Sequence, residues 1–129
     1  MAAILVVDDQ PAVLALIRIS LESAGHHVVA VDDSRAVSGL LKKQTLDLLI
    51  TDIFMPDQDG IELIQAVRKE FPTVAIIAMS GVSLERREYY LEAGRTFGAD
   101  AILGKPFGGK ELFASIEEAL GKAALRKPN

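Results

Sequence analysis

The chain contains no cysteine, and its basic residues are outnumbered by acidic ones. The absence of cysteine excludes disulfide bonds and thiolate metal sites. The 14 Lys and Arg residues stand against 18 Asp and Glu residues, which gives a net charge of −4 and a pI near 5.1. These basic residues are scattered and form no stripe of the kind that binding to a nucleic-acid backbone requires. We therefore expect no nucleic-acid partner.

Long apolar runs are also missing. Every apolar stretch is far shorter than the roughly 20 residues that a membrane-spanning helix needs. The first residues lead directly into an apolar segment with no basic region in front of it, and we therefore expect no targeting segment. We expect a cytoplasmic protein with no membrane partner.

The remaining composition is that of an ordinary globular protein. Half of the residues are hydrophobic and a quarter are charged, which is typical of soluble proteins rather than disordered ones. A length of 129 residues is common for a single domain. We expect one domain at residues 1–124, followed by a frayed tail at residues 125–129.

Short apolar runs alternate with amphipathic segments along the whole chain. This pattern predicts strands at residues 3–7, 27–31, 47–51, 74–79 and 100–103, and helices at 10–24, 34–43, 59–70, 84–97 and 108–123. Pro11 suits the first turn of a helix, and Gly25 suits a helix end. Asp33 is suited to a helix cap, and Pro72 closes the third helix. Five such alternations indicate an α/β domain with a parallel sheet and helices on both faces.

Three acidic residues directly follow two of the expected strands. Asp8 and Asp9 come after the apolar run 4–7, and Asp52 comes after residues 48–51. An acidic pair before a helix can simply cap it, but Asp52 lies several residues before the next helix and has no such role. The carboxyl ends of parallel strands meet in one crevice, where three carboxylates would repel each other. A hard cation or a proton relieves that repulsion.

Two further pairs follow the later strands. Ser80-Gly81 closes the fourth apolar run, and Lys105-Pro106 follows the fifth. Either pair alone is weak, because Ser-Gly is usually a turn and most lysines are solvated. Together with the acidic residues they occupy the ends of strands one, three, four and five, as expected around the switch point of a doubly wound sheet. Carboxylates for Mg²⁺, one of them free to act as a nucleophile, and a lysine together indicate phosphoryl transfer.

Four segments resemble the receiver domain of bacterial two-component response regulators, and the resemblance covers essentially the whole chain. The segments are Val6-Val7-Asp8-Asp9, Thr51-Asp52-Ile53-Phe54-Met55-Pro56-Asp57-Gln58-Asp59-Gly60, Met79-Ser80-Gly81 and Gly104-Lys105-Pro106-Phe107. The resemblance implies a flavodoxin-like, doubly wound five-stranded parallel sheet with strand order 2-1-3-4-5. It also implies five helices and a three-layer sandwich.

The resemblance also implies how the acidic residues would act. Asp52 would be the phosphoacceptor, a carboxylate nucleophile that forms an acyl phosphate. Asp9 and Asp52 would bind Mg²⁺ directly, together with the backbone carbonyl of Phe54. Asp8 would contribute mainly through water, which suits the preference of Mg²⁺ for retaining water ligands.

The resemblance also implies roles for the pairs Ser80-Gly81 and Lys105-Pro106. Lys105 would neutralise charge on the transferring phosphoryl oxygens, and Ser80 would donate its hydroxyl to one of them. Pro106 would fix the turn after Lys105, with a cis peptide bond as one means of doing so. Gly81 gives the backbone beside Ser80 the freedom to move.

The sequence departs from the family at three places. Ile102 stands where the family often has a Tyr or Phe that turns inward on phosphorylation. The stretch between Ser80 and Lys105 is about one helical turn longer than is usual, with the extra residues expected around 95–98. Phe54 and Val82 occupy two positions that tune acyl-phosphate lifetime, and neither side chain can orient an attacking water. We therefore expect slow self-dephosphorylation.

The expected first helix is more apolar than one buried face requires. The predicted core stripe consists of Val13, Leu16, Ile17 and Leu21, and the residues left toward solvent are Leu14, Ala15, Ile19 and Arg18. The exposed part is either an ordinary apolar surface or a docking face for a kinase or phosphotransferase helix. Tyr89 and Tyr90 in the fourth helix pose the same choice, with one packing inward and the other available to a partner.

These observations favour a stand-alone receiver, a phosphorylation-controlled switch rather than an enzyme in the usual sense. It would take a phosphoryl group from a histidine kinase or a histidine phosphotransfer protein, signal to an unknown downstream protein, and exist as a monomer or weak dimer. A Mg²⁺-dependent aspartyl phosphatase is the first alternative; it is less favoured because Phe54 occupies the place of the second acid and no cap domain is present. A degenerate receiver that only binds proteins is less favoured because all five catalytic positions are filled.

Overall fold

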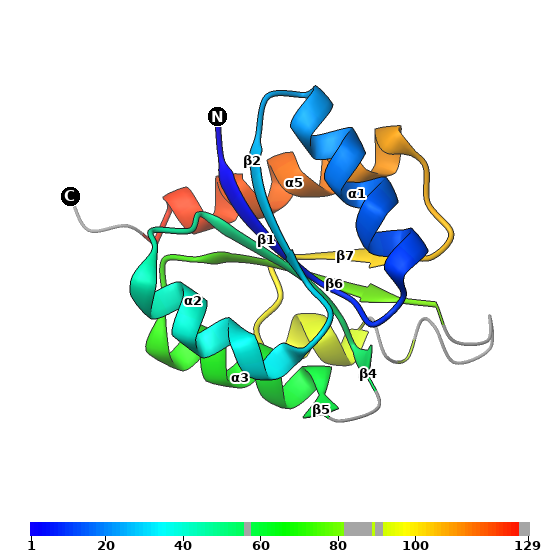
Figure 1. Cartoon of the computed structure of the whole chain (residues 1–129). Helices are drawn as coiled ribbons and strands as arrows, with labels where there is room; N and C mark the ends of the chain where they lie inside the picture. The colour runs from blue at the N-terminus through cyan, green and yellow to red at the C-terminus, as the bar shows by residue number, and fades with distance from the viewer. Residues whose placement is uncertain (56–57, 82–88, 90–91, 127–129) are drawn as a thin grey trace.

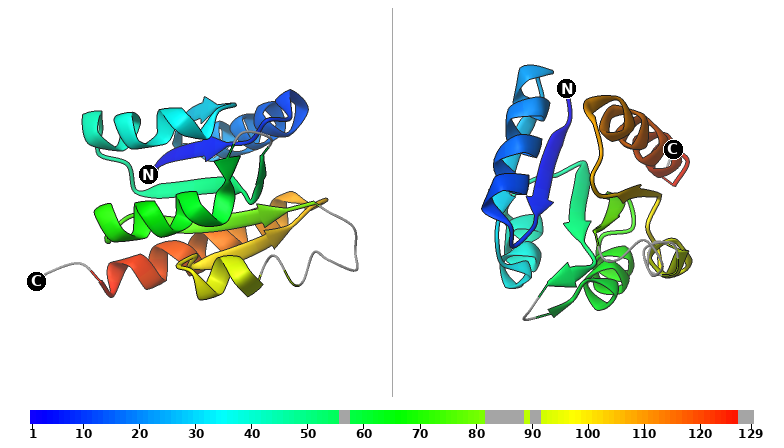
Figure 2. Two further views of the ribbon diagram at one scale, coloured as in Figure 1. Left: turned by 90° about the horizontal axis from the view of Figure 1, so that it is seen from below. Right: turned by 90° about the vertical axis from the view of Figure 1, so that its right-hand side faces the viewer.

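A five-stranded parallel sheet forms the centre of the computed structural model, which describes residues 1–55, 58–81, 89 and 92–126 (Figure 1). Its strands are β1 (Ala3–Val7), β2 (His27–Val31), β3 (Leu48–Asp52), β6 (Ala75–Ser80) and β7 (Ala101–Gly104). They lie in the order β2-β1-β3-β6-β7, which confirms the predicted order 2-1-3-4-5 and the flavodoxin-like fold. In Figure 2 the arrowheads of β1, β6 and β7 point the same way, so the carboxyl ends of the strands share one edge.

Helices cover both faces of this sheet (Figure 1). The described helices are α1 (Pro11–Ser23), the 3₁₀ turn η1 (Ser34–Ala36), α2 (Val37–Lys43), α3 (Gly60–Glu70) and α5 (Gly109–Ala124). Residues 92–96 are also helical and belong to the expected fourth helix, of which 84–88 and 90–91 lie outside the described residues. No helix in the described ranges is long and apolar enough to cross a membrane.

Alternate residues of each buried strand pack against opposite helix layers. In β1, Ile4 and Val6 pack in the core beneath α1 and α5, whereas Leu5 and Val7 pack in the core beneath α2 and α3. All four side chains are fully buried. Burial on both faces explains why the strands appear in the sequence as uninterrupted apolar runs.

The predicted turn and cap residues are confirmed. Pro11 is the first residue of α1, and Gly25 follows the helix with a positive φ of 92°, a conformation that favours glycine. The Asp33 carboxylate accepts a hydrogen bond from the Arg35 N–H at 2.8 Å and so caps η1. Helix α3 ends at Glu70, two residues before Pro72.

The prediction of which α1 side chains face the core is wrong at two positions, Leu14 and Leu16. Ile17 and Leu21 are buried as expected, but Leu16 is 60% exposed. Leu14, which was expected to face solvent, instead packs against the core. The spacing of 14, 17 and 21 alternates three and four residues and follows one helix face, whereas Leu16 projects to the side of it.

A charged cluster ties several elements together at the amino ends of β6 and β7. The Asp100 carboxylate is 5% exposed and accepts hydrogen bonds from the Ile76 N–H at 3.0 Å and from Arg68 Nη2 at 2.7 Å. Arg126 Nη1 and Nη2 bind the same carboxylate at 2.6 and 2.9 Å. Arg126 was expected in a frayed tail, yet the buried carboxylate fixes it; residues 127–129 lie outside the described residues.

Candidate functional site

The carboxyl ends of β1 and β3 bring three carboxylates together. Asp8 and Asp9 directly follow β1, and Asp52 is the last residue of β3. One carboxylate oxygen from each of the three residues lies within 4.8 Å of the others. Asp8 is fully buried and Asp52 is 5% exposed, whereas Asp9 is exposed at the rim. The predicted acidic cluster is therefore present, and its arrangement is suited to a divalent cation.

Local backbone hydrogen bonds orient two of these carboxylates. Asp8 Oδ1 accepts from the Gln10 N–H at 2.9 Å, and Asp52 Oδ1 accepts from the Phe54 N–H at 2.9 Å. Each carboxylate thus makes a tight turn with the residue two positions later. The second oxygen of each, Oδ2, contacts Lys105 instead. The turns therefore hold both carboxylates toward the same cation.

Close packing of the chain after Asp52 requires a glycine at the start of α3. A Cβ atom on Gly60 would lie 2.5 Å from Ile53 Cα and 2.6 Å from the carbonyl oxygens of Asp52 and Ile53. The Gly60 N–H also donates to the Ile53 carbonyl at 2.9 Å. The contacted atoms are backbone, which cannot yield as a flexible side chain does. Gly60 therefore permits the approach that positions the Asp52 loop.

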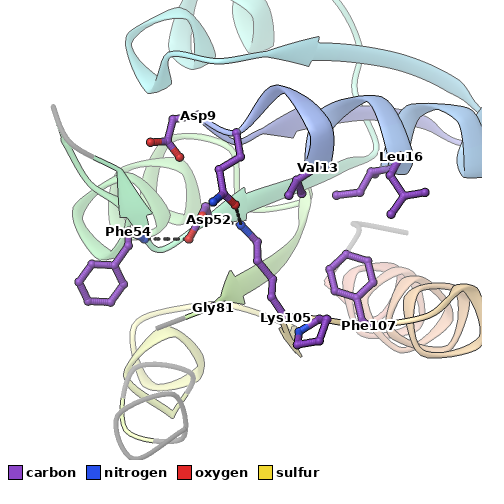
Figure 3. Close-up of a pocket in the computed structure, with 11 residues that line it drawn as sticks. Asp9, Val13, Leu16, Asp52, Phe54, Gly81, Lys105 and Phe107 are labelled. Atoms are coloured by element: carbon purple, nitrogen blue, oxygen red, sulfur yellow. Dashed lines mark hydrogen bonds and ion pairs between the residues drawn. The ribbon is translucent and has the colours of Figure 1, made fainter. Parts of the chain in front are cut away.

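Lys105 extends from the loop after β7 into the crevice (Figure 3). Its Nζ donates to Asp8 Oδ2 at 2.6 Å, to Asp52 Oδ2 at 2.7 Å and to Gln10 Oε1 at 3.2 Å. The Lys105 N–H also donates to the Ser80 carbonyl at 2.8 Å, which joins the ends of β6 and β7. The predicted fixed cation thus lies directly among the carboxylates.

Two neighbouring residues shape the path of the lysine. The Lys105-Pro106 peptide bond is cis, as the sequence suggested. A Cβ atom on Gly81 would lie 3.0 Å from Lys105 Cδ and 3.1 Å from its Cβ. Gly81 therefore leaves room for the lysine stem, in addition to the backbone freedom expected of it.

Burial and pairing shift the pKa values of two groups in the crevice. Burial raises the pKa of Asp8 above its usual range, although hydrogen bonds from Lys105 and the Gln10 N–H act in the opposite direction. Burial alone would lower the pKa of Lys105, but its contacts with Asp52 and Asp8 outweigh this and raise it. Lys105 is therefore a stable cation at neutral pH, while Asp8 resists ionisation.

Ser80 ends β6 with its side chain fully buried. Its Oγ has no hydrogen-bond partner among the described residues. A buried hydroxyl without a partner costs free energy, so it is uncommon away from functional sites. The predicted hydroxyl donor is therefore available for a further acceptor beside the crevice.

A cavity of about 520 Å³ opens over these polar groups. Asp9, Gln10, Asp52 and Lys105 form its polar part (Figure 3). Its apolar and backbone lining consists of Val13, Leu16, Ile17, Phe54, Gly81, Pro106 and Phe107. The apolar side, built by α1 and the loop after Pro106, explains why Leu16 is not part of the core.

The structure brings most of the predicted site residues together but not all of them. Ile102 is partly buried and packs against the core beneath α2 and α3, and it does not line the cavity. Val82 lies outside the described residues. The sequence analysis gave no role to Gln10, and it quoted Phe107 only as part of a family-like segment, because an isolated Gln or Phe has no specific chemical pattern. The only signal for Gln10 was its place before Pro11, at a helix start where a capping residue would be usual.

The fold and the acidic crevice define a flavodoxin-like domain with a candidate phosphoryl-transfer site. A family model described as the response regulator receiver domain matches residues 4–117. The chain belongs to this family, which serves in two-component systems as a phosphorylation-dependent switch.

Known proteins of this family resemble the chain throughout its length. The transcriptional regulatory protein CpxR of Escherichia coli is 34% identical over 124 residues, which are 95% of this chain and 51% of CpxR. The regulatory protein PhoP of Bacillus subtilis is 28% identical over 129 residues, with 98% of this chain and 51% of PhoP covered. The chain thus spans about half the length of the curated relatives it matches.

Solved structures show the same fold over whole chains. A receiver domain protein from Clostridium thermocellum superposes with a TM-score of 0.87 at 26% identity, covering 98% of this chain and 100% of that one. A CheY-like receiver domain protein from Methanospirillum hungatei gives a TM-score of 0.82 at 30% identity, with coverage of 98% and 99%.

Proposed function

We propose that this domain accepts a phosphoryl group on Asp52 from a histidine kinase or a histidine phosphotransfer protein and uses it to control a partner. The observation that carries the proposal is the contact of Lys105 Nζ with Asp52 Oδ2 at 2.7 Å inside a cluster of three carboxylates. A nucleophilic carboxylate beside a fixed cation is suited to a reaction that concentrates negative charge.

The residues present fit a Mg²⁺ ion. Asp9 and Asp52, together with the backbone carbonyl of Phe54, would hold it directly, and Asp8 would act through water. This oxygen-only donor set, open to the cavity at Asp9, matches the ligand preference of Mg²⁺. When bound, the ion would neutralise charge on the phosphoryl oxygens.

In the proposed transfer, an Asp52 carboxylate oxygen attacks the phosphorus of the donor. The new P–O bond forms as the P–N bond of the phosphohistidine breaks, and the imidazole nitrogen keeps the bonding electron pair. Lys105 stabilises the charge on the phosphoryl oxygens and remains protonated, as its raised pKa favours. The buried Ser80 hydroxyl would then find its missing acceptor in a phosphoryl oxygen.

The apolar wall of the cavity would receive the donor. Leu16 and Phe107 line this wall, and Leu16 and its α1 neighbour Ile19 are 60% and 64% exposed. An amphipathic helix carrying the phosphohistidine could cover these side chains while its imidazole reaches Asp52. We retain the expectation of a cytoplasmic monomer or weak dimer.

The signal would leave through the backbone beside Ser80. Ser80 would move toward the phosphoryl group, and Gly81 would allow the following loop to move with it. Ile102 cannot reproduce the inward turn of an aromatic ring, because it is smaller and its first torsion is stiff. We therefore expect the change to lie mainly in the loop 80–85 and the fourth helix, with Tyr89 or Tyr90 and Arg95 on the affected surface. Much of this segment, Tyr90 included, lies outside the described residues.

Acyl phosphate formation tests the proposal. With acetyl phosphate and Mg²⁺, the wild-type protein should gain one phosphoryl group, and chelation of Mg²⁺ should prevent this. Asp52→Asn should gain none while remaining folded, because the amide fills the same volume without nucleophilic charge. Equal incorporation in Asp52→Asn, with an unchanged mass gain, would refute the assignment.

A further inference from the structure

The side chain of Gln10 has no role in the helix it precedes. Gln10 occupies the N-cap position of α1, yet its side chain makes no capping hydrogen bond. The helix start is stabilised otherwise, because the Gln10 carbonyl accepts from the N–H groups of Val13 and Leu14 at 3.1 Å and Pro11 needs no acceptor. Gln is also not among the favoured N-cap residues. The helix therefore gives no reason for a glutamine here.

The Gln10 side chain points instead to the crevice. It lines the cavity, and its Oε1 accepts a hydrogen bond from Lys105 Nζ at 3.2 Å. Lys105 has two other acceptors in this cluster, the Oδ2 atoms of Asp8 and Asp52 at 2.6 and 2.7 Å. Gln10 is thus the only neutral acceptor among these three side chains.

Cation binding would affect the three acceptors differently. A divalent ion held by the carboxylates competes with the Lys105 ammonium for Asp8 and Asp52, because all of these interactions depend on the same negative charge. The neutral amide oxygen of Gln10 is a weaker ligand for such an ion and keeps its hydrogen bond to the ammonium. It lies at the start of α1, on the wall of the cavity through which a donor would arrive.

We propose that Gln10 is a positioning residue for phosphoryl transfer: its side-chain carbonyl holds the Lys105 ammonium at the mouth of the crevice when a metal ion shares the carboxylates. The inference rests on the proposed transfer to Asp52. Gln10 acts through Lys105 and does not itself react. Its contribution is to keep the lysine directed at the incoming phosphoryl oxygens rather than at solvent.

Gln10→Asn separates this role from a structural one. Asn is one methylene shorter and should not reach Lys105, but it is a favoured N-cap residue, so the melting temperature should stay equal or rise. At saturating Mg²⁺, acetyl phosphate should modify Asp52 in this variant about tenfold more slowly, as expected for the loss of one charge-assisted hydrogen bond. Gln65→Asn, on the exposed face of α3, is the matched control and should leave the rate of phosphorylation unchanged.

A second measurement, the NMR signal of the Lys105 ammonium, does not depend on phosphoryl transfer. In the wild-type protein with Mg²⁺ alone, the Lys105 ammonium should give a slowly exchanging proton signal in ¹⁵N-edited NMR. That signal should be lost in Gln10→Asn and kept in the control Gln65→Asn. A Gln10→Asn rate within twofold of wild type, or an unchanged Lys105 signal, would overturn the proposal. If the wild-type protein forms no acyl phosphate at Asp52, the proposed function fails instead, and the Lys105 signal still decides the role of Gln10.

Discussion

At the scale of single residues, one lysine is set against three carboxylates in a buried crevice. Lys105 contacts Asp8 and Asp52, while Asp9 stays exposed at the rim. With all groups ionised the cluster carries excess negative charge. Burial raises the pKa of Asp8, which is the expected response of a carboxylate in such a site. Repulsion among these carboxylates therefore lowers the stability of the fold when no metal ion is bound, and the same negative charge attracts a cation.

The variant Asp8→Asn should show how much the ionised Asp8 carboxylate destabilises the fold when no metal ion is bound. Because the folded-state pKa of Asp8 is raised, the folded protein holds its proton more firmly than the unfolded chain does. Its ionisation therefore removes stability as pH rises above the ordinary Asp pKa of about 3.9. In EDTA, the free energy of unfolding of Asp8→Asn should increasingly exceed that of wild type as the pH rises from about 4 through the folded-state pKa of Asp8. Urea unfolding measures this; a variant less stable than wild type throughout that range would contradict the account.

Phe54 controls the lifetime expected for the acyl phosphate. Its side chain lines the cavity beside Asp52 and cannot orient an attacking water. Phe54→Asn would place a hydrogen-bonding group there and should speed dephosphorylation roughly tenfold, which corresponds to about 1.4 kcal/mol in the barrier. Phe97→Asn is the control, because Phe97 is 44% exposed, close to the 41% of Phe54, and does not line the cavity. Decay of the purified phosphoprotein tests this, and equal lifetimes for wild type and Phe54→Asn would show that water access is not limiting.

At the scale of elements, the site is made by the ends of strands and by the loops that follow them. Some of these features could be predicted and others could not. The apolar runs located the strands, but the runs stopped before Asp52 and Ser80 because these side chains are polar. In the structure both residues still pair in the sheet, Asp52 opposite Met79 and Ser80 opposite Gly104. The backbone continues the strand regardless of side-chain polarity.

The small hairpin after β3 shows a second limit. Strands β4 (Phe54–Met55) and β5 (Gln58–Asp59) have two residues each, which is too short for any hydrophobic alternation. The sequence analysis predicted no strand there and began the third helix at residue 59, which belongs to β5. Leu16 shows a third limit. It was predicted in the core of the domain but lines the cavity, because the sequence alone does not distinguish an apolar residue of a cavity wall from one of the core.

Gly60 offers a test of how the Asp52 loop is held. Gly60→Ala places a Cβ atom against the backbone of Asp52 and Ile53, so it should lower the free energy of unfolding by about 2 kcal/mol or more. It should also slow phosphorylation, because the loop must shift. Gly39→Ala is the matched control: its Cβ would meet nothing within 4 Å in helix α2, and it should stabilise by roughly 0.5–1 kcal/mol. Chemical denaturation compares the two, and equal effects would exclude a special role for Gly60.

At the scale of the whole molecule, chemistry and structural anchoring occupy opposite ends of the sheet. The carboxyl ends of the strands carry the acidic crevice, and the amino ends of β6 and β7 carry the Asp100 cluster with Arg68 and Arg126. The alternation of strands and helices made the α/β class predictable, and the family resemblance supplied the strand order. The Asp100 cluster was not predictable, because its members are far apart in the sequence and have no motif.

Asp100 should account for part of the acid sensitivity of the fold. Burial alone would raise the pKa of Asp100, but hydrogen bonds from Arg126 and the Ile76 N–H, with the charge of Arg68, lower it. A lowered folded-state pKa adds stability that is complete above the ordinary Asp pKa and is lost as pH falls through the folded-state value. Asp100→Asn should cost about 2–4 kcal/mol near pH 7. The difference from wild type should shrink below about pH 4. Urea titrations at several pH values check this, and a constant difference across them would contradict it.

The central claim is that Asp52 carries the phosphoryl group, and the most direct measurement locates that group chemically. The wild-type protein is phosphorylated by a phosphohistidine donor with Mg²⁺ and then treated with borohydride, which reduces an aspartyl phosphate to homoserine. Peptide mass spectrometry should find homoserine at position 52, with none there when Mg²⁺ is chelated. Homoserine at another aspartate, or a phosphorylated protein that retains an unmodified Asp52, would contradict the account.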